Sequence, residues 1–309
     1  SPNKKLILFF GIISGFIFGV TIILLREFLD STIKSIEEIE RRGLPILAII
    51  PSIGAAENRN KKKKKGYRIN LKLNNSEKLE RRLLTHEDPK SPISEAYRSL
   101  RTSLMYDNRE EDSKIILVSS PGPGEGKTTT VANLAITYAN LGKKTLIIDA
   151  DLRKPVLHKV FNQEKDKGLT HLIANTTDDY KDIVKHTEVE NLDLITCGVV
   201  PPNPSELLAS EELENLIGKL EENYDIILFD APPIMAVTDA IVLSRLINQF
   251  VLVVHFGKTD KGAIARTLTS MAQVNVEQSG IVLNALDYRS SYYYSGSYYN
   301  YYNYYYYGT

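Results

Sequence analysis

A glycine-rich loop lies between an apolar segment and a predicted helix, and it constrains the fold of this chain more than any other feature. The stretch is KIILVSSPGPGEGKTTT, from Lys114 to Thr130. Its apolar run predicts a strand, its glycines and prolines predict a loop, and Gly126, Lys127 and Thr128 open a helix. Backbone amides in such a loop, together with the partial positive charge of the helix N-terminus, bind phosphate groups. The sequence therefore predicts a P-loop nucleotide-binding domain.

The residues of this loop have expected roles in holding a nucleotide. Lys127 can reach the β- and γ-phosphates, and the hydroxyl group of Thr128 suits Mg²⁺. The usual pattern has glycine at position 121, where this chain has Pro121, and Gly122 and Gly124 restore flexibility. The residues expected to contact the nucleotide are Gly122, Gly124, Glu125, Gly126, Lys127, Thr128, Thr129 and Asn284.

Acidic residues follow two predicted strands, at the position where an α/β fold places its ligands. TLIIDADLRKP contains Asp149 and Asp151, which share one side of an extended strand end, and YDIILFDAPP contains Asp230. Carboxylates beside a triphosphate can hold Mg²⁺ or accept the proton of a hydroxyl group. We assign Asp149 as the proton acceptor and Thr128, Asp151 and Asp230 as Mg²⁺ ligands. The pattern alone leaves the division among the three carboxylates open.

Short apolar, largely β-branched runs alternate with helical stretches from about residue 91 onward. The expected strands are Lys114–Ser119, Thr145–Ile148, Leu192–Thr196, Ile226–Phe229, Phe250–His255 and Ile281–Asn284, and the expected helices include Thr129–Asn140 and Glu211–Asn223. Strands without polar alternation suit a sheet that is buried on both faces. The expected fold class is therefore α/β, a P-loop NTPase with a mainly parallel sheet flanked by helices and preceded by one transmembrane helix.

An uncharged apolar segment near the N-terminus predicts the transmembrane helix. Leu6 to Leu25 form 20 residues without charge, the length that crosses about 30 Å of hydrocarbon. Basic residues are more numerous after the segment than before it, which places the remainder of the chain in the cytoplasm. A signal peptide is the alternative, but the segment is long for one and no small-residue cleavage site follows it.

Two segments of unusual composition flank the predicted domain. Glu27–Arg42 is expected to be a helix, and the polar stretch 55–75, with the run Lys61–Lys65, is expected to be a linker. This basic run is either a solvated charge run or attracted to anionic lipid. Of the 18 tyrosines, 11 lie after Ser291, in a segment that cannot form a packed core and is expected to be disordered. The expected domains are 1–30 (transmembrane helix and flanks), 31–85 (juxtamembrane segment and basic linker), 86–289 (P-loop ATP-binding domain) and 290–309 (tyrosine-rich tail).

Overall charge and cysteine content bear on three features: a nucleic-acid partner, a disulfide and a cysteine-based metal site. The 38 basic residues balance 38 acidic residues, so the overall charge does not predict a nucleic-acid partner. The single cysteine, Cys197, excludes an internal disulfide and a multi-cysteine metal site.

Taken together, these motifs resemble the bacterial tyrosine kinases, or BY-kinases, of the polysaccharide co-polymerase systems that act in capsule and exopolysaccharide biosynthesis. In that family the P-loop is joined by an apolar-apolar-apolar-D-x-D-x-R motif, a DxPP element and an E-x-x-R-x-x-R oligomerisation element. These are matched by Leu146, Ile147, Ile148, Asp149, Asp151 and Arg153, by Asp230, Pro232 and Pro233, and by Glu95, Arg98 and Arg101. The strings GVVPPNPSELLAS (198–210) and PPIMAVTDA (232–240) and the tyrosine-rich tail are also similar to the family.

The resemblance implies an ATP-dependent protein-tyrosine autokinase that phosphorylates the tail of neighbouring subunits and regulates polysaccharide polymerisation and export. It implies catalytic roles for Lys127, Asp149, Asp151, Arg153 and Asp230. The implied phosphoacceptors are Tyr292, Tyr293, Tyr294, Tyr298, Tyr299, Tyr301, Tyr302, Tyr304, Tyr305, Tyr306 and Tyr307.

The resemblance also implies partners and a location. The expected partners are further copies of the chain in a homo-oligomeric ring, an extracytoplasmic activator region or protein, a tyrosine phosphatase, and the polysaccharide export and polymerisation machinery. The expected location is the bacterial inner membrane, with the kinase domain in the cytoplasm.

Two other P-loop classes fit the sequence less well. A ParA- or MinD-like ATPase carries an early signature lysine in its loop, where this chain has Gly122. A GTPase recognises guanine with N-K-x-D, but Asn284-Ala285-Leu286-Asp287 lacks the lysine. The expected cofactors are therefore ATP and Mg²⁺. Asn284 remains a candidate contact for adenine. A nucleotide-dependent assembly ring whose tail is phosphorylated by another enzyme is the non-enzymatic alternative.

Overall fold

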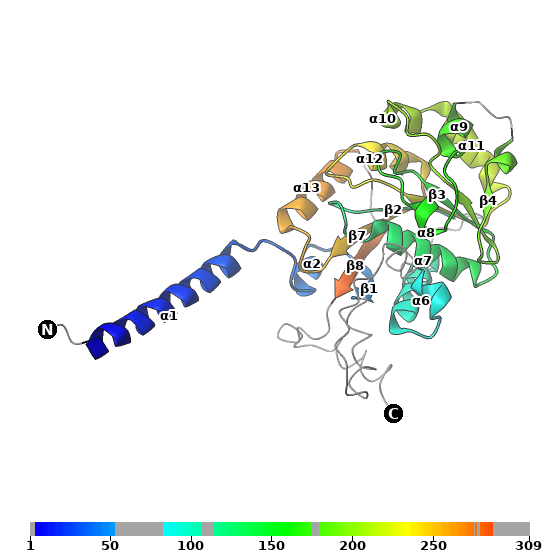
Figure 1. Ribbon diagram of the computed structural model, residues 1–309. Coiled ribbons are helices and arrows are strands. Elements are labelled where there is room, and N and C mark those ends of the chain that lie inside the picture. The colour runs from blue at the N-terminus through cyan, green and yellow to red at the C-terminus, as the bar shows by residue number, and fades with distance from the viewer. Residues whose placement is uncertain are drawn as a thin grey trace.

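The computed structural model describes residues 4–52, 83–106, 114–174, 179–274, 276 and 279–286. Its centre is an eight-stranded sheet of order β1-β8-β7-β2-β6-β3-β5-β4, parallel except for the pairing of β4 with β5 (Figure 1). The strands are β1 (Ile46–Pro51), β2 (Lys114–Ser119), β3 (Thr145–Asp149), β4 (Lys185–His186), β5 (Leu192–Ile195), β6 (Ile226–Asp230), β7 (Gln249–His255) and β8 (Gly280–Leu286). All six predicted strands are present, with ends shifted by no more than two residues.

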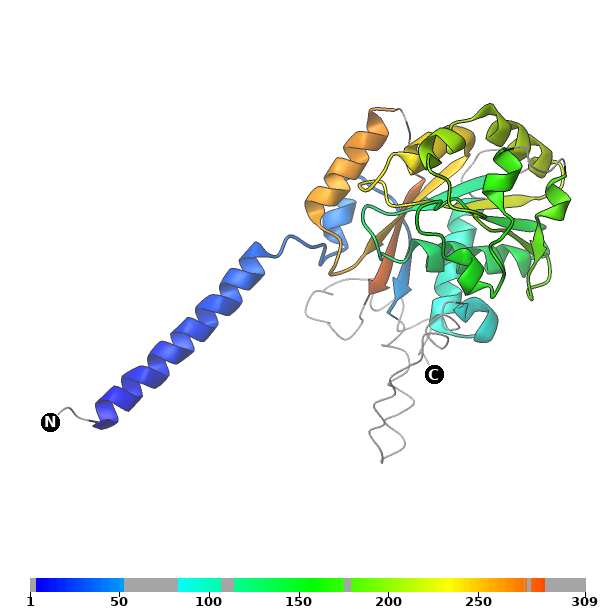
Figure 2. The same cartoon turned by 45° about the horizontal axis from the view of Figure 1, so that its top comes forward.

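Helices cover both faces of this sheet (Figure 2). On one face pack α6 (Pro92–Met105), α7 (Lys127–Ala139) and α8 (Leu157–Val160), and on the other pack α9 (Leu169–Ile173), α11 (Glu211–Glu221), α12 (Asp239–Leu243) and α13 (Lys261–Ala272). The short elements are α5 (Leu84–Glu87), α10 (Pro204–Leu208), η1 (Tyr180–Asp182) and η2 (Ser244–Leu246). Alternate residues of β2 enter opposite cores, Leu117 on one side and Ile116 on the other. The predicted parallel sheet, buried on both faces, is confirmed.

The N-terminal helix α1 (Lys4–Leu29) projects away from the sheet in both views (Figures 1 and 2). Its part from Leu8 to Leu29 is long and apolar enough to cross a membrane, and none of it is buried against the other described residues. An apolar helix without a protein core to cover it suits a lipid environment. The helix therefore has the properties of a membrane anchor.

The prediction of one continuous helix over Glu27–Arg42 is wrong in the central part of that range. Helix α1 ends at Leu29, and α2 covers only Glu37–Glu40. Between them the carboxylate of Asp30 accepts hydrogen bonds from the backbone N–H and the hydroxyl of Thr32, at 3.0 and 2.7 Å. This local turn competes with helical hydrogen bonding.

Segments predicted to lie outside the P-loop domain contribute to its core. Ile33, Ile36 and Ile39 are buried in the same hydrophobic core as α13, so burial of apolar area decides the path of this segment. The apolar run after Gly43 forms β1, which pairs in parallel with β8 at the edge of the sheet. An edge position tolerates the proline that ends this strand.

Two predicted features lie outside the described residues. They are the basic run Lys61–Lys65 and the tyrosine-rich tail with its phosphoacceptors Tyr292 to Tyr307.

Candidate active site

The pairing of three neighbouring strands brings the P-loop and the predicted carboxylates together. Strand β6 lies between β2 and β3, so that Asp230 is the register partner of both Val118 and Asp149. The P-loop follows β2 directly, and α7 begins at Lys127. Since the carboxyl ends of parallel strands meet at one edge of the sheet, residues more than 80 positions apart share one site.

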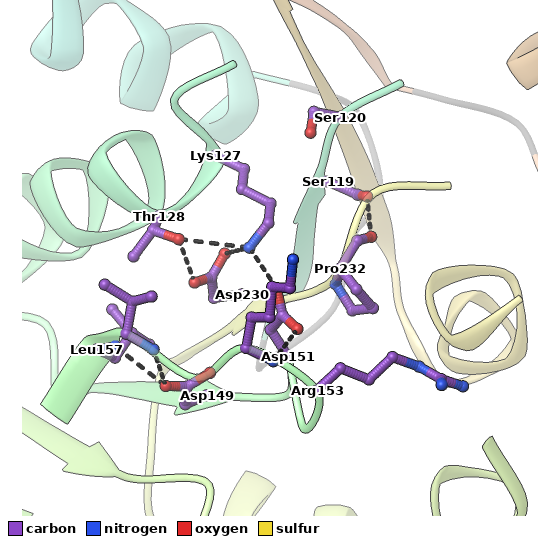
Figure 3. Close-up of polar contacts among 12 residues, drawn as sticks. Ser119, Ser120, Lys127, Thr128, Asp149, Asp151, Arg153, Leu157, Asp230 and Pro232 are labelled. Atoms are coloured by element: carbon purple, nitrogen blue, oxygen red, sulfur yellow. Dashed lines mark hydrogen bonds and ion pairs between the residues drawn. The ribbon is translucent and has the colours of Figure 1, made fainter. Parts of the chain in front are cut away.

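Lys127 is the centre of this site. Its ammonium nitrogen lies 3.0 Å from Asp151 Oδ2 and 3.3 Å from Asp230 Oδ1 (Figure 3). Thr128 Oγ1 donates a hydrogen bond to Asp230 Oδ2 at 2.6 Å. Burial lowers the pKa of Lys127, but the charges of Asp230 and Asp151 outweigh burial and raise its pKa overall. The site therefore holds a permanent cation beside the start of a helix.

Asp149 is a fully buried carboxyl group, and only one of its two oxygens accepts hydrogen bonds from the described residues. Its Oδ2 accepts hydrogen bonds from the backbone N–H groups of Val156 and Leu157 at 3.1 and 3.0 Å. Within the described residues its Oδ1 is buried without a hydrogen-bond partner. Burial, and next the charge of Asp230, raise the pKa of Asp149 to about 8. A carboxyl group that titrates near neutral pH suits the transfer of a proton from a hydroxyl group.

The donor atoms of the site fit a Mg²⁺ ion bound with nucleotide phosphates. The hydroxyl oxygen of Thr128 and a carboxylate oxygen of Asp230 lie within 2.6 Å of each other. Asp151 adds a second carboxylate near the same lysine, and the unpartnered oxygen of Asp149 has capacity for a further contact. All of these are hard oxygen donors, which Mg²⁺ prefers.

The P-loop backbone depends on glycine at two of the predicted positions. Gly124 has φ +69° and Gly126 has φ +102°, values that side-chain-bearing residues rarely adopt. A Cβ atom on Gly126 would lie 2.0 Å from Asn284 Nδ2, because Asn284 donates a hydrogen bond to the carbonyl of Glu125 at 2.8 Å. Asn284 thus lies against the loop, and its proposed contact with adenine stays a prediction.

Glu125 and Thr129 are predicted nucleotide contacts that also make hydrogen bonds within the protein. The buried Glu125 carboxylate accepts the Gly122 N–H at 3.0 Å and the hydroxyl of Thr259 at 2.8 Å. Burial raises the pKa of Glu125. Thr129 lies half-buried in the first turn of α7, where its carbonyl accepts from the Asn133 side chain. The side chain of Glu125 therefore stabilises the conformation of the P-loop through buried hydrogen bonds.

Arg153 points away from the carboxylates, as Figure 3 shows. Its Nε and Nη2 donate to the two oxygens of the buried Asp239, at 3.0 and 3.2 Å, and its Nη2 also lies 3.2 Å from Ser205 Oγ. Asp239 and Ser205 lie in the two family-like strings, but nothing in the sequence pairs them with Arg153. A catalytic role for Arg153 stays a prediction.

Glu95, Arg98 and Arg101 lie on α6, apart from the site. Arg98 Nη1 forms an ion pair with Glu95 at 2.5 Å, and Arg101 Nη1 donates to the Thr137 carbonyl of α7 at 2.6 Å. Arg98 is thus near the surface, whereas Arg101 ties two helices together. Their role in oligomerisation stays a prediction.

Lys258 and Thr259 contact the P-loop, although no sequence motif predicted a role for either residue. The Lys258 ammonium donates to the carbonyls of Pro123 and Gly124 at 3.0 and 2.6 Å. Both residues follow strand β7 at the carboxyl edge of the sheet. Their position after a predicted strand is the signal that could have identified them.

Comparisons with known proteins agree with this geometry. The AAA domain family matches residues 113–275. CapB of Staphylococcus aureus is 42% identical over 214 residues, which are 69% of this chain and 93% of that protein. The tyrosine-protein kinase YwqD of Bacillus subtilis is 38% identical over 229 residues, 74% of this chain and 96% of that protein. The solved structure of the kinase domain of the Escherichia coli tyrosine kinase ETK has a TM-score of 0.72 and 30% identity, and the alignment covers 86% of this chain and 99% of that structure.

Proposed function

This chain belongs to the bacterial tyrosine-protein kinases, and we propose that it transfers the γ-phosphoryl group of ATP to the tyrosines of its own C-terminal segment on neighbouring subunits. The observation that carries the proposal is the cluster of Lys127, Asp149, Asp151 and Asp230 beside the P-loop, with Lys127 Nζ at 3.0 and 3.3 Å from two carboxylates. A cation and a proton acceptor at a phosphate-binding loop are the groups that phosphoryl transfer requires.

The proposed chemistry uses the side chains as the structure arranges them. The tyrosine oxygen forms a bond to the γ-phosphorus, the bond from that phosphorus to the β,γ-bridging oxygen breaks, and ADP leaves. Lys127 stabilises negative charge on the transferring group. The phenolic proton passes to the ionised form of Asp149, because a raised pKa makes this carboxylate a stronger base. Bound Mg²⁺, held through Thr128, Asp151 and Asp230, would neutralise phosphate charge.

Transfer between subunits is compatible with the length of the tail. The 20 residues of the tail, 290–309, can span roughly 65 Å when extended, so the tail can reach the site of a neighbouring copy. Tyrosine suits this role because its hydroxyl group stands farther from the backbone than that of serine. The proposed homo-oligomeric ring, with Glu95, Arg98 and Arg101 at its interface, would bring tails and sites together.

Phosphorylation would change the charge of such an assembly. Each phosphate adds about −1.5 to −2 charges, so 11 modified tyrosines would add on the order of −16 to −22 per tail. Repulsion between converging tails opposes ring closure, even when it is screened over about 8 Å. We therefore propose a cycle in which the unmodified form assembles, phosphorylates neighbouring tails and dissociates, and a phosphatase resets it.

The apolar helix α1 and the kinase family suggest the cellular setting. We propose that α1 anchors the chain in the bacterial inner membrane with the kinase domain in the cytoplasm. There it would respond to an extracytoplasmic activator region or protein and regulate the polymerisation and export of capsule or exopolysaccharide.

A mixing experiment tests transfer between subunits. A Lys127→Met variant with an intact tail is combined with an active protein whose tail is deleted at residue 290, with γ-labelled ATP and Mg²⁺. The inactive protein should acquire phosphotyrosine, and its oligomer should loosen as it does. Lys127→Met alone, expressed where no other tyrosine kinase acts, is the control and should stay unmodified. Phosphotyrosine in that control would refute the kinase assignment, and none in the mixture would refute transfer between subunits.

A further inference from the structure

Three successive carbonyl groups of the P-loop accept hydrogen bonds from side chains that lie far along the chain. The Lys258 ammonium donates to the carbonyl oxygen of Pro123 at 3.0 Å and to that of Gly124 at 2.6 Å. The Asn284 side-chain amide donates to the carbonyl of Glu125 at 2.8 Å. Lys258 follows β7 and Asn284 lies on β8, the two strands next to β2 on one side of the sheet. The outer side of the loop is thus held by neighbouring strands.

These contacts determine where the amide groups of the loop point. In a trans peptide unit the C=O and N–H bonds lie in one plane and point in opposite directions. The described part of the chain contains no cis peptide bond. With the carbonyls of Pro123 and Gly124 turned towards Lys258, the N–H groups of Gly124 and Glu125 are directed to the opposite side of the loop. Amides that point inward from such a loop are the groups that bind phosphate oxygens.

The glycine at position 124 leaves room for this lysine. A Cβ atom there would lie 2.8 Å from Lys258 Nζ, so the end of the lysine side chain would have to move away from the loop. Gly124 also has φ +69°, so two independent features favour glycine. The loop and the lysine therefore fit each other in shape as well as in hydrogen bonding.

The turn that carries Lys258 is itself fixed on two sides. The buried hydroxyl of Thr259 donates to Glu125 Oε1 at 2.8 Å and accepts the His255 N–H at 2.8 Å. On the other side, the backbone N–H of Ile33 donates to the Thr259 carbonyl at 2.9 Å. An exposed lysine on an ordinary surface loop would be mobile, but here the backbone of the turn is held close to the P-loop.

We propose that Lys258 is a positioning residue of the nucleotide site, which acts by holding the carbonyls of Pro123 and Gly124 outward so that the amides behind them face the phosphates. Thr259 supports it by fixing the turn and the Glu125 side chain. The inference rests on the proposed function, since it takes the P-loop to bind nucleotide phosphates. It adds to that function a cation that contacts the loop rather than the substrate.

The test is the affinity of the full chain, in detergent, for ADP with Mg²⁺, measured by isothermal titration so that no phosphoryl transfer is needed. Lys258→Met keeps an unbranched side chain, one heavy atom shorter, and removes the donor, and we expect binding to weaken about tenfold or more. Lys261→Met removes the same charge three residues along, where the ammonium contacts Glu38 at 2.7 Å, and should bind ADP like the wild type. The thermal midpoint without nucleotide should fall by no more than a few degrees in either variant, so that all three proteins are folded during the titration.

A second pair of variants tests the support from Thr259. Thr259→Val removes the hydroxyl at constant shape and should weaken ADP binding. Thr259→Ser keeps the hydroxyl and should bind ADP with nearly the affinity of the wild type. Wild-type affinity in Lys258→Met, or equal losses in Lys258→Met and Lys261→Met, would overturn the proposal. A lowered midpoint in Lys258→Met that accounts for the loss would overturn it as well. If the wild-type protein binds no ADP, the proposed function fails instead.

Discussion

Alanine at two glycine positions should have opposite effects on the stability of this protein. Gly126 has φ +102°, and a Cβ atom there would lie 2.0 Å from Asn284 Nδ2. Gly218 lies inside helix α11, and no atom of the described residues lies within 4 Å of its added Cβ. The same chemical change therefore meets strain and a steric clash at one position and open space at the other.

The magnitudes follow from the local geometry. At Gly126, alanine costs roughly 1–2 kcal/mol for the left-handed backbone, and displacing Asn284 from Glu125 costs about 0.5–1.5 kcal/mol for the hydrogen bond. The sum of about 1.5–3.5 kcal/mol corresponds to a decrease in melting temperature of roughly 3–14 °C for a domain of this size. At Gly218, alanine should stabilise the helix by about 0.5–1 kcal/mol, an increase of roughly 1–4 °C.

Calorimetry of the full chain in detergent measures both changes, and titration with ADP and Mg²⁺ measures the effect on the site. Gly126→Ala should lose nucleotide binding as well as stability, because the displaced loop no longer presents its amides together. Gly218→Ala should bind ADP like the wild type. A Gly126→Ala protein that melts and binds like the wild type would refute the close approach of Asn284 to the loop.

Two further predictions concern pH and assembly. Burial and the charge of Asp230 raise the pKa of Asp149 to about 8, so between about pH 4 and pH 8 the folded protein holds a proton that the unfolded chain releases. The melting temperature of the nucleotide-free protein should fall as the pH rises through that range. Asp149→Asn should flatten this dependence of melting temperature on pH, whereas the control Asp182→Asn, at an exposed position, should not. Equal slopes of melting temperature against pH in all three proteins would contradict the assignment of the raised pKa to Asp149. Arg98→Glu should reduce the mass of the oligomer, measured by light scattering, without lowering the melting temperature, whereas Arg101→Glu should lower both, because Arg101 also binds the Thr137 carbonyl. An unchanged mass in both variants would argue against an interface on α6.

Local patterns in the sequence were sufficient for the main parts of the fold and for the type of site. The apolar runs Lys114–Ser119, Thr145–Ile148 and Ile226–Phe229 predict buried strands, and the glycines before Lys127 predict a phosphate-binding loop, because both signals depend only on neighbouring residues. The apolar run of α1 is recognisable for the same reason. The tertiary structure then confirmed the strands and placed the predicted lysine and carboxylates in one cluster.

Contacts between distant segments were decided only by the tertiary structure. The register that sets Asp149 beside Asp230 depends on the order of strands in the sheet, and no local pattern contains that order. The segment around Ile33 reads as amphipathic helix but is not helical in the structure, because packing in the core outweighs its weak helical preference. Lys258 reads as an ordinary surface residue, and Arg153 reads as part of the site although it turns to the buried Asp239. In each case the partner lies far away in the sequence, so its effect appears only when the chain has folded.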